Sequence, residues 1–137
     1  MMHANLSDKA ERAARGRVVL LMIGAVVVGT AAFLRTTDTS PTAEGLGWIL
    51  LMAAWSVVLA TGGGLALNKR MRDLLNDELS IANRNRAISW GFFAMLLASA
   101  VLLTLAGKAF DASGAIRIVT ASGLAVAMAR YAMLEWR

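Results

Sequence analysis

Charged side chains that could bind a partner or a ligand gather in one polar stretch of the chain, residues 68–86 (NKRMRDLLNDELSIANRNR). The stretch holds the acids Asp73, Asp77 and Glu78 and, after them, the bases Arg84 and Arg86. On a helical projection Glu78 points toward the apolar side of the stretch. A carboxylate in that place suits recognition of a partner or a lipid headgroup, and we predict these five residues as candidate partner-binding positions. The simpler interpretation of Glu78 is a helix-start glutamate favoured by the helix dipole.

Groups for catalysis are few. The chain has no cysteine, and its single histidine, His3, lies near the N-terminus. All of its acids lie outside the apolar runs, whereas proton-coupled transporters place an ionisable group at membrane depth. The sequence also contains no phosphate-binding loop and no dinucleotide-binding fingerprint. We therefore expect a protein that is not an enzyme and has no catalytic residue, cofactor or metal site.

The elements that position the polar stretch are apolar helices. Apolar residues make up 58% of the 137 residues, above the roughly 45–50% of soluble domains. They fall into runs that predict four transmembrane helices at about residues 18–35, 45–68, 87–107 and 114–134. We expect an all-α, polytopic membrane protein, an antiparallel up-down bundle that forms one domain over residues 1–137.

Helix boundaries are marked by several capping signals. Asp8 and Glu11 have the spacing of a capping box in a basic leader, residues 1–17. Ser40-Pro41 predicts the start of the second helix, and Asn76-Asp77 predicts a turn. With that turn, one helix runs from about Gly45 to Leu75 and the next begins near Glu78. Helices 1–3 would then extend into the cytoplasm, with residues 68–86 as a helical hairpin; the alternative is an amphipathic helix on the membrane surface.

Small residues predict where helices pack closely. The candidate packing positions are Ala25, Gly29, Gly62, Gly63, Gly64, Ala121, Gly123, Ala125 and Ala129. The triple glycine would lie near the inner end of the second span, for backbone packing or as a hinge. In the fourth span, Arg117 and Arg130 are expected to reach toward the headgroups, with Tyr131 and Trp136 in an aromatic belt.

Basic residues predict the orientation. In a four-span topology, eleven of the fourteen Lys and Arg residues lie on the side of the termini, and only Arg35, Lys108 and Arg117 lie on the other side. The positive-inside rule places both termini in the cytoplasm. This asymmetry also accounts for the net charge of +5 without nucleic acid as a partner. Short loops favour the inner membrane of a bacterium.

These features support three hypotheses about function. The first is a non-catalytic accessory or interaction subunit of a membrane complex, whose partners are membrane lipids and either copies of itself, as a homo-oligomer, or a larger complex. Its contacts would use the small-residue faces of the first and fourth spans and residues 68–86. The second is a small oligomeric transporter or pore with Gly62–Gly64 near its inner mouth. The third is a lipid-binding protein of the inner leaflet that uses Asp73, Asp77 and Glu78.

Overall fold

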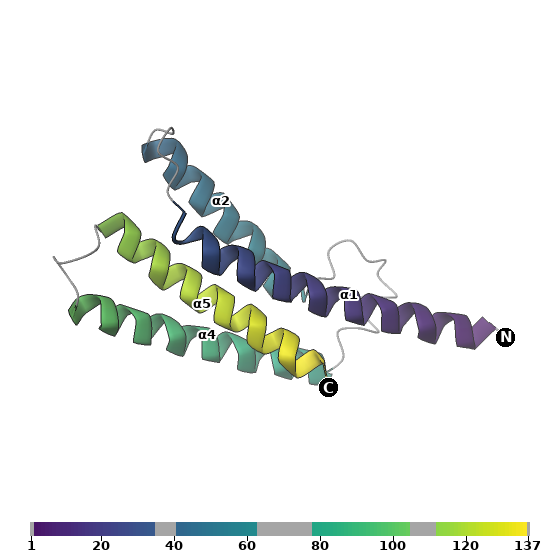
Figure 1. The fold of residues 1–137 in the computed structure, drawn as a ribbon. Coiled ribbons are helices and arrows are strands. Elements are labelled where there is room, and N and C mark those ends of the chain that lie inside the picture. The colour runs from purple at the N-terminus through teal and green to yellow at the C-terminus, as the bar shows by residue number, and fades with distance from the viewer. Residues whose placement is uncertain (1, 35–40, 63–77, 105–111, 137) are drawn as a thin grey trace.

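Four helices make up the part of the chain that the computed structural model describes, residues 2–34, 41–62, 78–104 and 112–136. They are α1 (Met2–Ala31), α2 (Pro41–Ala60), α4 (Glu78–Thr104) and α5 (Ala112–Glu135) (Figure 1). No strand occurs among these residues, and each helix is long and apolar enough to cross a membrane. The prediction of an all-α protein with four membrane-spanning helices is confirmed.

Two helices begin where capping signals predicted. α2 starts at Pro41, and Glu44 lies in its first turn, close to the positive end of the helix dipole. α4 starts at Glu78, which occupies the same favourable position. The predicted turn residues Asn76 and Asp77 lie outside the described part of the chain. α1 begins at Met2, earlier than the predicted start at Asp8.

The end of α2 differs from the prediction. The helix stops at Ala60 and closes through a hydrogen bond from Gly62 N to Leu59 O of 3.1 Å. Gly62 has a φ of 62°, a backbone conformation that glycine adopts readily and that commonly terminates helices. A continuous helix from Gly45 to Leu75 is therefore wrong, and the predicted end of the span near residue 68 lies outside the described residues. Residues 63–77, with Gly63, Gly64 and Asp73, lie outside the described residues.

Helix α5 is the central helix of the bundle. It packs extensively against α4 on one side and α1 on another, while α2 touches α5 and α1 over much smaller areas (Figure 1). Near the C-terminus of α5, Glu135 meets Arg17 from α1, and near its start Thr120 meets Trp48 from the first turns of α2. α1 and α4 thus run in one direction and α2 and α5 in the other, as an up-down bundle requires.

The core is small and the outer surface is apolar. The buried cluster is built around Leu21, Met128 and Tyr131, with Val18, Leu59, Ala87, Ala127 and Ala132. Large apolar side chains such as Ile23, Leu50 and Leu97 are exposed on the outside of the bundle. In a bilayer such side chains face hydrocarbon and need no cover. The chain is an integral membrane protein.

Glycines set the distance between α4 and α5. A Cβ on Gly91 would lie 2.5 Å from the carbonyl oxygen of Gly123 and 2.8 Å from Cβ of Ala127. Ala87 and Gly91 are four residues apart on α4, and Gly123 and Ala127 have the same spacing on α5. This is the small-xxx-small arrangement that brings membrane helices into close contact.

Candidate functional site

A polar cluster joins α1, α4 and α5 at the end of the bundle where the C-terminus lies. We call it the Arg17 cluster: Arg17, Ser80, Asn83, Tyr131 and Glu135. The Arg17 guanidinium forms an ion pair with the Glu135 carboxylate and donates to Ser80 Oγ at 3.3 Å. Ser80 Oγ and the Tyr131 hydroxyl are 2.8 Å apart, and Asn83 Nδ2 donates to Glu135 Oε1 at 3.3 Å. The guanidinium also lies over the Tyr131 ring, 5.4 Å from its centroid.

The ion pair of this cluster is enclosed by the protein. The side chains of Arg17 and Glu135 are 4% and 13% exposed, and Tyr131 is fully buried. A charge in such a place is tolerated only with a partner, since its desolvation is costly. Each member therefore depends on the others, and the cluster links the middle of α1 and the start of α4 to the end of α5.

A second cluster closes the opposite end of the bundle. We call it the Arg117 cluster: Glu44 and Trp48 from α2, with Arg117 and Thr120 from α5. Arg117 Nη1 is 2.6 Å from Glu44 Oε1, and its guanidinium lies 5.8 Å from the centroid of the Trp48 ring. Trp48 Nε1 donates to Thr120 Oγ1 at 3.3 Å. This cluster holds α2, the least packed helix, against α5.

The two clusters are separated by about the thickness of a bilayer core. Arg117 and Glu135 are eighteen residues apart on α5, about 27 Å at 1.5 Å per residue. The hydrocarbon core of a membrane is about 30 Å thick. The distance between the two clusters therefore matches the thickness of that apolar layer. The Arg117 side chain is 13% exposed and is paired with Glu44 within the bundle, so whether it reaches the headgroups stays a prediction.

A third arginine also stacks on an aromatic ring. The Arg130 guanidinium lies 5.6 Å from the centroid of the Trp90 ring, and Trp90 is 51% exposed. Arg130 is half-buried, and its Nε atom is buried without a hydrogen-bond partner. No ion pair of Arg130 occurs within the described part of the chain.

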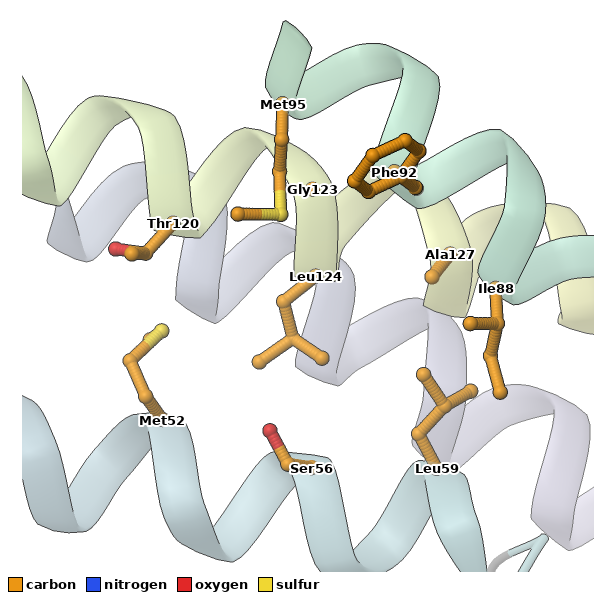
Figure 2. A pocket seen from close by; sticks show the side chains of 11 residues that line it. Met52, Ser56, Leu59, Ile88, Phe92, Met95, Thr120, Gly123, Leu124 and Ala127 are labelled. Atoms are coloured by element: carbon orange, nitrogen blue, oxygen red, sulfur yellow. The ribbon is translucent and has the colours of Figure 1, made fainter.

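An apolar groove separates α2 from α4. We call it the α2–α4 groove; its volume is about 380 Å³. Figure 2 shows Met52, Ser56 and Leu59 of α2 facing Ile88, Phe92 and Met95 of α4. The floor is α5, with Thr120, Gly123, Leu124 and Ala127. A second hollow of about 440 Å³ shares Thr120 and continues along α4 and α5 to Leu103 and Ala115.

The predicted partner-binding residues that the structure describes lie on α4. Glu78 and Arg86 are exposed on α4, and Arg84 is half-buried, while Asp73 and Asp77 lie outside the described residues. Among the acids that the structure describes, the bundle encloses Glu135 and Glu44.

The predicted packing residues lie mostly between the chain's own helices. Ala121 and Gly123 are buried, and Ala25 packs against the core. A Cβ on Gly29 would lie 4.0 Å from Cβ of Ala125 across the α1–α5 contact. Ala129 is half-buried, and Gly62 is buried in the turn after α2.

Several residues of these sites were not predicted from the sequence. Tyr131 was placed in an aromatic belt, but it is buried in the Arg17 cluster; Trp136, at 75% exposed, is free to face a headgroup layer. Glu135 and Arg17 lie at opposite ends of the chain, and nothing local marks them as a pair. The Ala87-xxx-Gly91 spacing was the signal that could have identified the packing face of α4.

Comparisons with known proteins add no family to this description. No protein-family model, no curated protein and no solved structure matches the chain. The fold and its clusters define the class: a multi-pass helical membrane protein with four spans.

Proposed function

We propose that this protein is a non-catalytic interaction subunit of a membrane complex, and that the α2–α4 groove holds one transmembrane helix of a partner polypeptide. The groove is the observation that carries the proposal. It is open toward the surrounding membrane, and its walls come from two helices that each pack on α5 and hardly touch one another.

The length of the hollow supports a helix as the occupant. Together, the α2–α4 groove and its continuation follow α4 from Ile88 to Leu103. These two residues are fifteen positions apart on α4, about 22 Å along the helix, which is most of the roughly 30 Å hydrocarbon core. A helix lying along α4 and α5 would contact the bundle over nearly the whole depth of the membrane.

The lining also suits a packed helix. Met52 and Met95 are unbranched and flexible, so they adjust to the surface of another helix. The Ser56 hydroxyl is directed into the groove (Figure 2). In a membrane such a group stabilises helix contacts when it bonds across the interface. We therefore expect a small or hydrogen-bonding residue midway along the partner helix.

The small-residue face of α5 is less available for a partner. Gly123 lies against α4, and Ala125 lies near Gly29 of α1. The proposal therefore moves the contact from the small-residue faces of the first and fourth spans to the groove beside α2.

The location is also part of the proposal. We place the protein in the inner membrane of a bacterium with both termini in the cytoplasm. The excess of Lys and Arg on the side of the termini supports this orientation. The Arg17 cluster would then lie at the cytoplasmic boundary and the Arg117 cluster at the outer one.

Purification in a mild detergent tests the proposal. The wild-type chain should purify with a stoichiometric membrane partner or, if the occupant is a second copy, as a defined oligomer. Ser56→Trp fills the groove and should abolish that assembly, whereas Leu97→Trp, on an exposed face of α4 away from the groove, should leave it intact. A strictly monomeric wild-type protein, or an assembly that survives Ser56→Trp, would overturn the proposal.

A further inference from the structure

Three arginines of the bundle stack on aromatic rings, and they differ in whether a carboxylate is paired with them. Arg17 lies over Tyr131 and is paired with Glu135. Arg117 lies over Trp48 and is paired with Glu44.

Arg130 lies over Trp90 but has no carboxylate partner among the described residues. We infer that Arg130 and Trp90 form a binding site for the phosphate group of a membrane phospholipid.

The depth of Arg130 fits a lipid phosphate. Arg130 lies five residues before Glu135 on α5, about 7.5 Å further toward the middle of the membrane. Its long side chain can bring the charge to the level of the headgroups. Trp90 is half-exposed beside it, and the amphipathic indole ring favours that interfacial layer.

An apolar groove next to Arg130 can take the acyl chain of the same lipid. The groove lies between α1 and α5, has a volume of about 370 Å³, and is lined by Met22, Ala25, Val26, Ala125, Val126 and Ala129. Val126 and Arg130 are four residues apart on α5 and therefore share a helix face. The groove thus reaches the face of α5 on which Arg130 lies, one helical turn from it.

The chemistry favours a phosphate group over other anions. A guanidinium presents a planar fork of donors that matches two phosphate oxygens. The buried Nε of Arg130 has no hydrogen-bond partner, and an uncompensated cation is costly in a membrane. A phospholipid supplies the missing negative charge from the bilayer itself. This site shares no residue with the α2–α4 groove, so the two proposals can fail separately.

Native mass spectrometry of the detergent-solubilised full chain tests the site. The probes are phosphatidylglycerol, a diacylglycerol with the same acyl chains, and inorganic phosphate. The wild-type chain should retain one phosphatidylglycerol more strongly than the diacylglycerol. Arg130→Gln should weaken phosphatidylglycerol retention about tenfold, the loss expected for a charge-assisted contact. It should leave diacylglycerol retention unchanged.

Two further variants distinguish the contribution of the lipid phosphate from that of the acyl chain. Arg130→Lys keeps the charge but loses the fork and should retain an intermediate amount of phosphatidylglycerol. Val126→Trp fills the apolar groove from its exposed side and should weaken both lipids alike. The matched control is Arg12→Gln, an exposed arginine on α1, which should behave like the wild type.

Two results would overturn the inference. One is equal retention of phosphatidylglycerol by the wild type and both Arg130 variants. The other is binding of inorganic phosphate as tight as that of phosphatidylglycerol, because the site would then recognise a free anion without a lipid chain.

Discussion

Arg17 of α1 and Glu135 of α5 form a buried ion pair although they are 118 residues apart in the chain. The pair links the first helix to the last at one end of the bundle. Ser80 and Asn83 of α4 complete the arrangement through hydrogen bonds to Arg17 and Glu135. Three of the four helices are therefore held in register by one polar cluster.

Removing one partner of this pair should destabilise the bundle strongly. Glu135→Ala removes a carboxylate that pairs with the buried Arg17 guanidinium, and we expect a loss of about 3–5 kcal/mol in the free energy of unfolding. This free energy is measured by unfolding the protein in detergent mixtures of increasing denaturing strength and monitoring the loss of helix by circular dichroism. The double variant Arg17→Met/Glu135→Met should recover much of the loss. The control is Glu11→Ala, whose pair with Arg15 is exposed and contributes about 0–1 kcal/mol.

If Glu135→Ala unfolds like the Glu11→Ala control, the ion pair does not hold the helices together. The same conclusion would follow if the double variant were no more stable than Glu135→Ala.

The hydroxyl of Tyr131 should contribute less to the free energy of unfolding than the ion pair does, and its contribution should depend on Ser80. Tyr131→Phe removes the contact to Ser80 at 2.8 Å, and we expect a loss of about 1 kcal/mol. Unfolding measured on Tyr131→Phe, Ser80→Ala and the double variant should show coupling between the two residues. Trp48→Phe at the opposite end supplies the control, since its effect should simply add to that of Tyr131→Phe. Strict additivity of Tyr131→Phe and Ser80→Ala would argue against the contact.

A methyl group at the α4–α5 crossing should force the helices apart. In Gly91→Ala the new Cβ meets the backbone oxygen of Gly123 at 2.5 Å, and backbone cannot move aside as a flexible side chain does. We expect a loss of about 1–3 kcal/mol. Gly47→Ala is the matched control, because nothing lies within 4 Å of a Cβ at that position. Equal stability of the two variants would show that α4 and α5 are not in close contact.

Single cysteines should report the orientation of the bundle, because the natural chain has none. Asn85→Cys lies near the start of α4 and Ala112→Cys at the start of α5, and both positions are exposed. With the termini in the cytoplasm, a membrane-impermeant maleimide added to intact cells should label Ala112→Cys and spare Asn85→Cys. The opposite pattern would invert the proposed topology.

Much of the fold could be predicted from local sequence. The apolar runs indicated four helices, and Pro41 and Glu78 marked helix starts because capping depends on a few neighbouring residues. The end of α2 was missed because uncharged residues continue past Gly62, and hydropathy alone does not register the positive φ that stops the helix. An apolar run therefore locates a membrane-spanning helix but does not fix where that helix begins or ends.

The candidate sites were harder to predict because they depend on which helix faces meet. Glu78 stood out by its place on a helical projection, yet it is exposed. Glu135 looked like an ordinary terminal acid, and its pairing follows only from the antiparallel contact of α1 and α5. Tyr131 is suited to either a membrane interface or a buried hydrogen bond. Only the packing of three helices decides which of these two places Tyr131 takes.

Site-specific cross-linking in native membranes tests the proposed role of the α2–α4 groove most directly. A photoactivatable maleimide cross-linker attached to Ser56→Cys lies in the groove, and one attached to Leu97→Cys lies on an exposed face of α4 outside it. We predict a single defined protein adduct from Ser56→Cys and none from Leu97→Cys. No adduct from Ser56→Cys, or the same adducts from both positions, would contradict the proposal that the groove holds a partner helix.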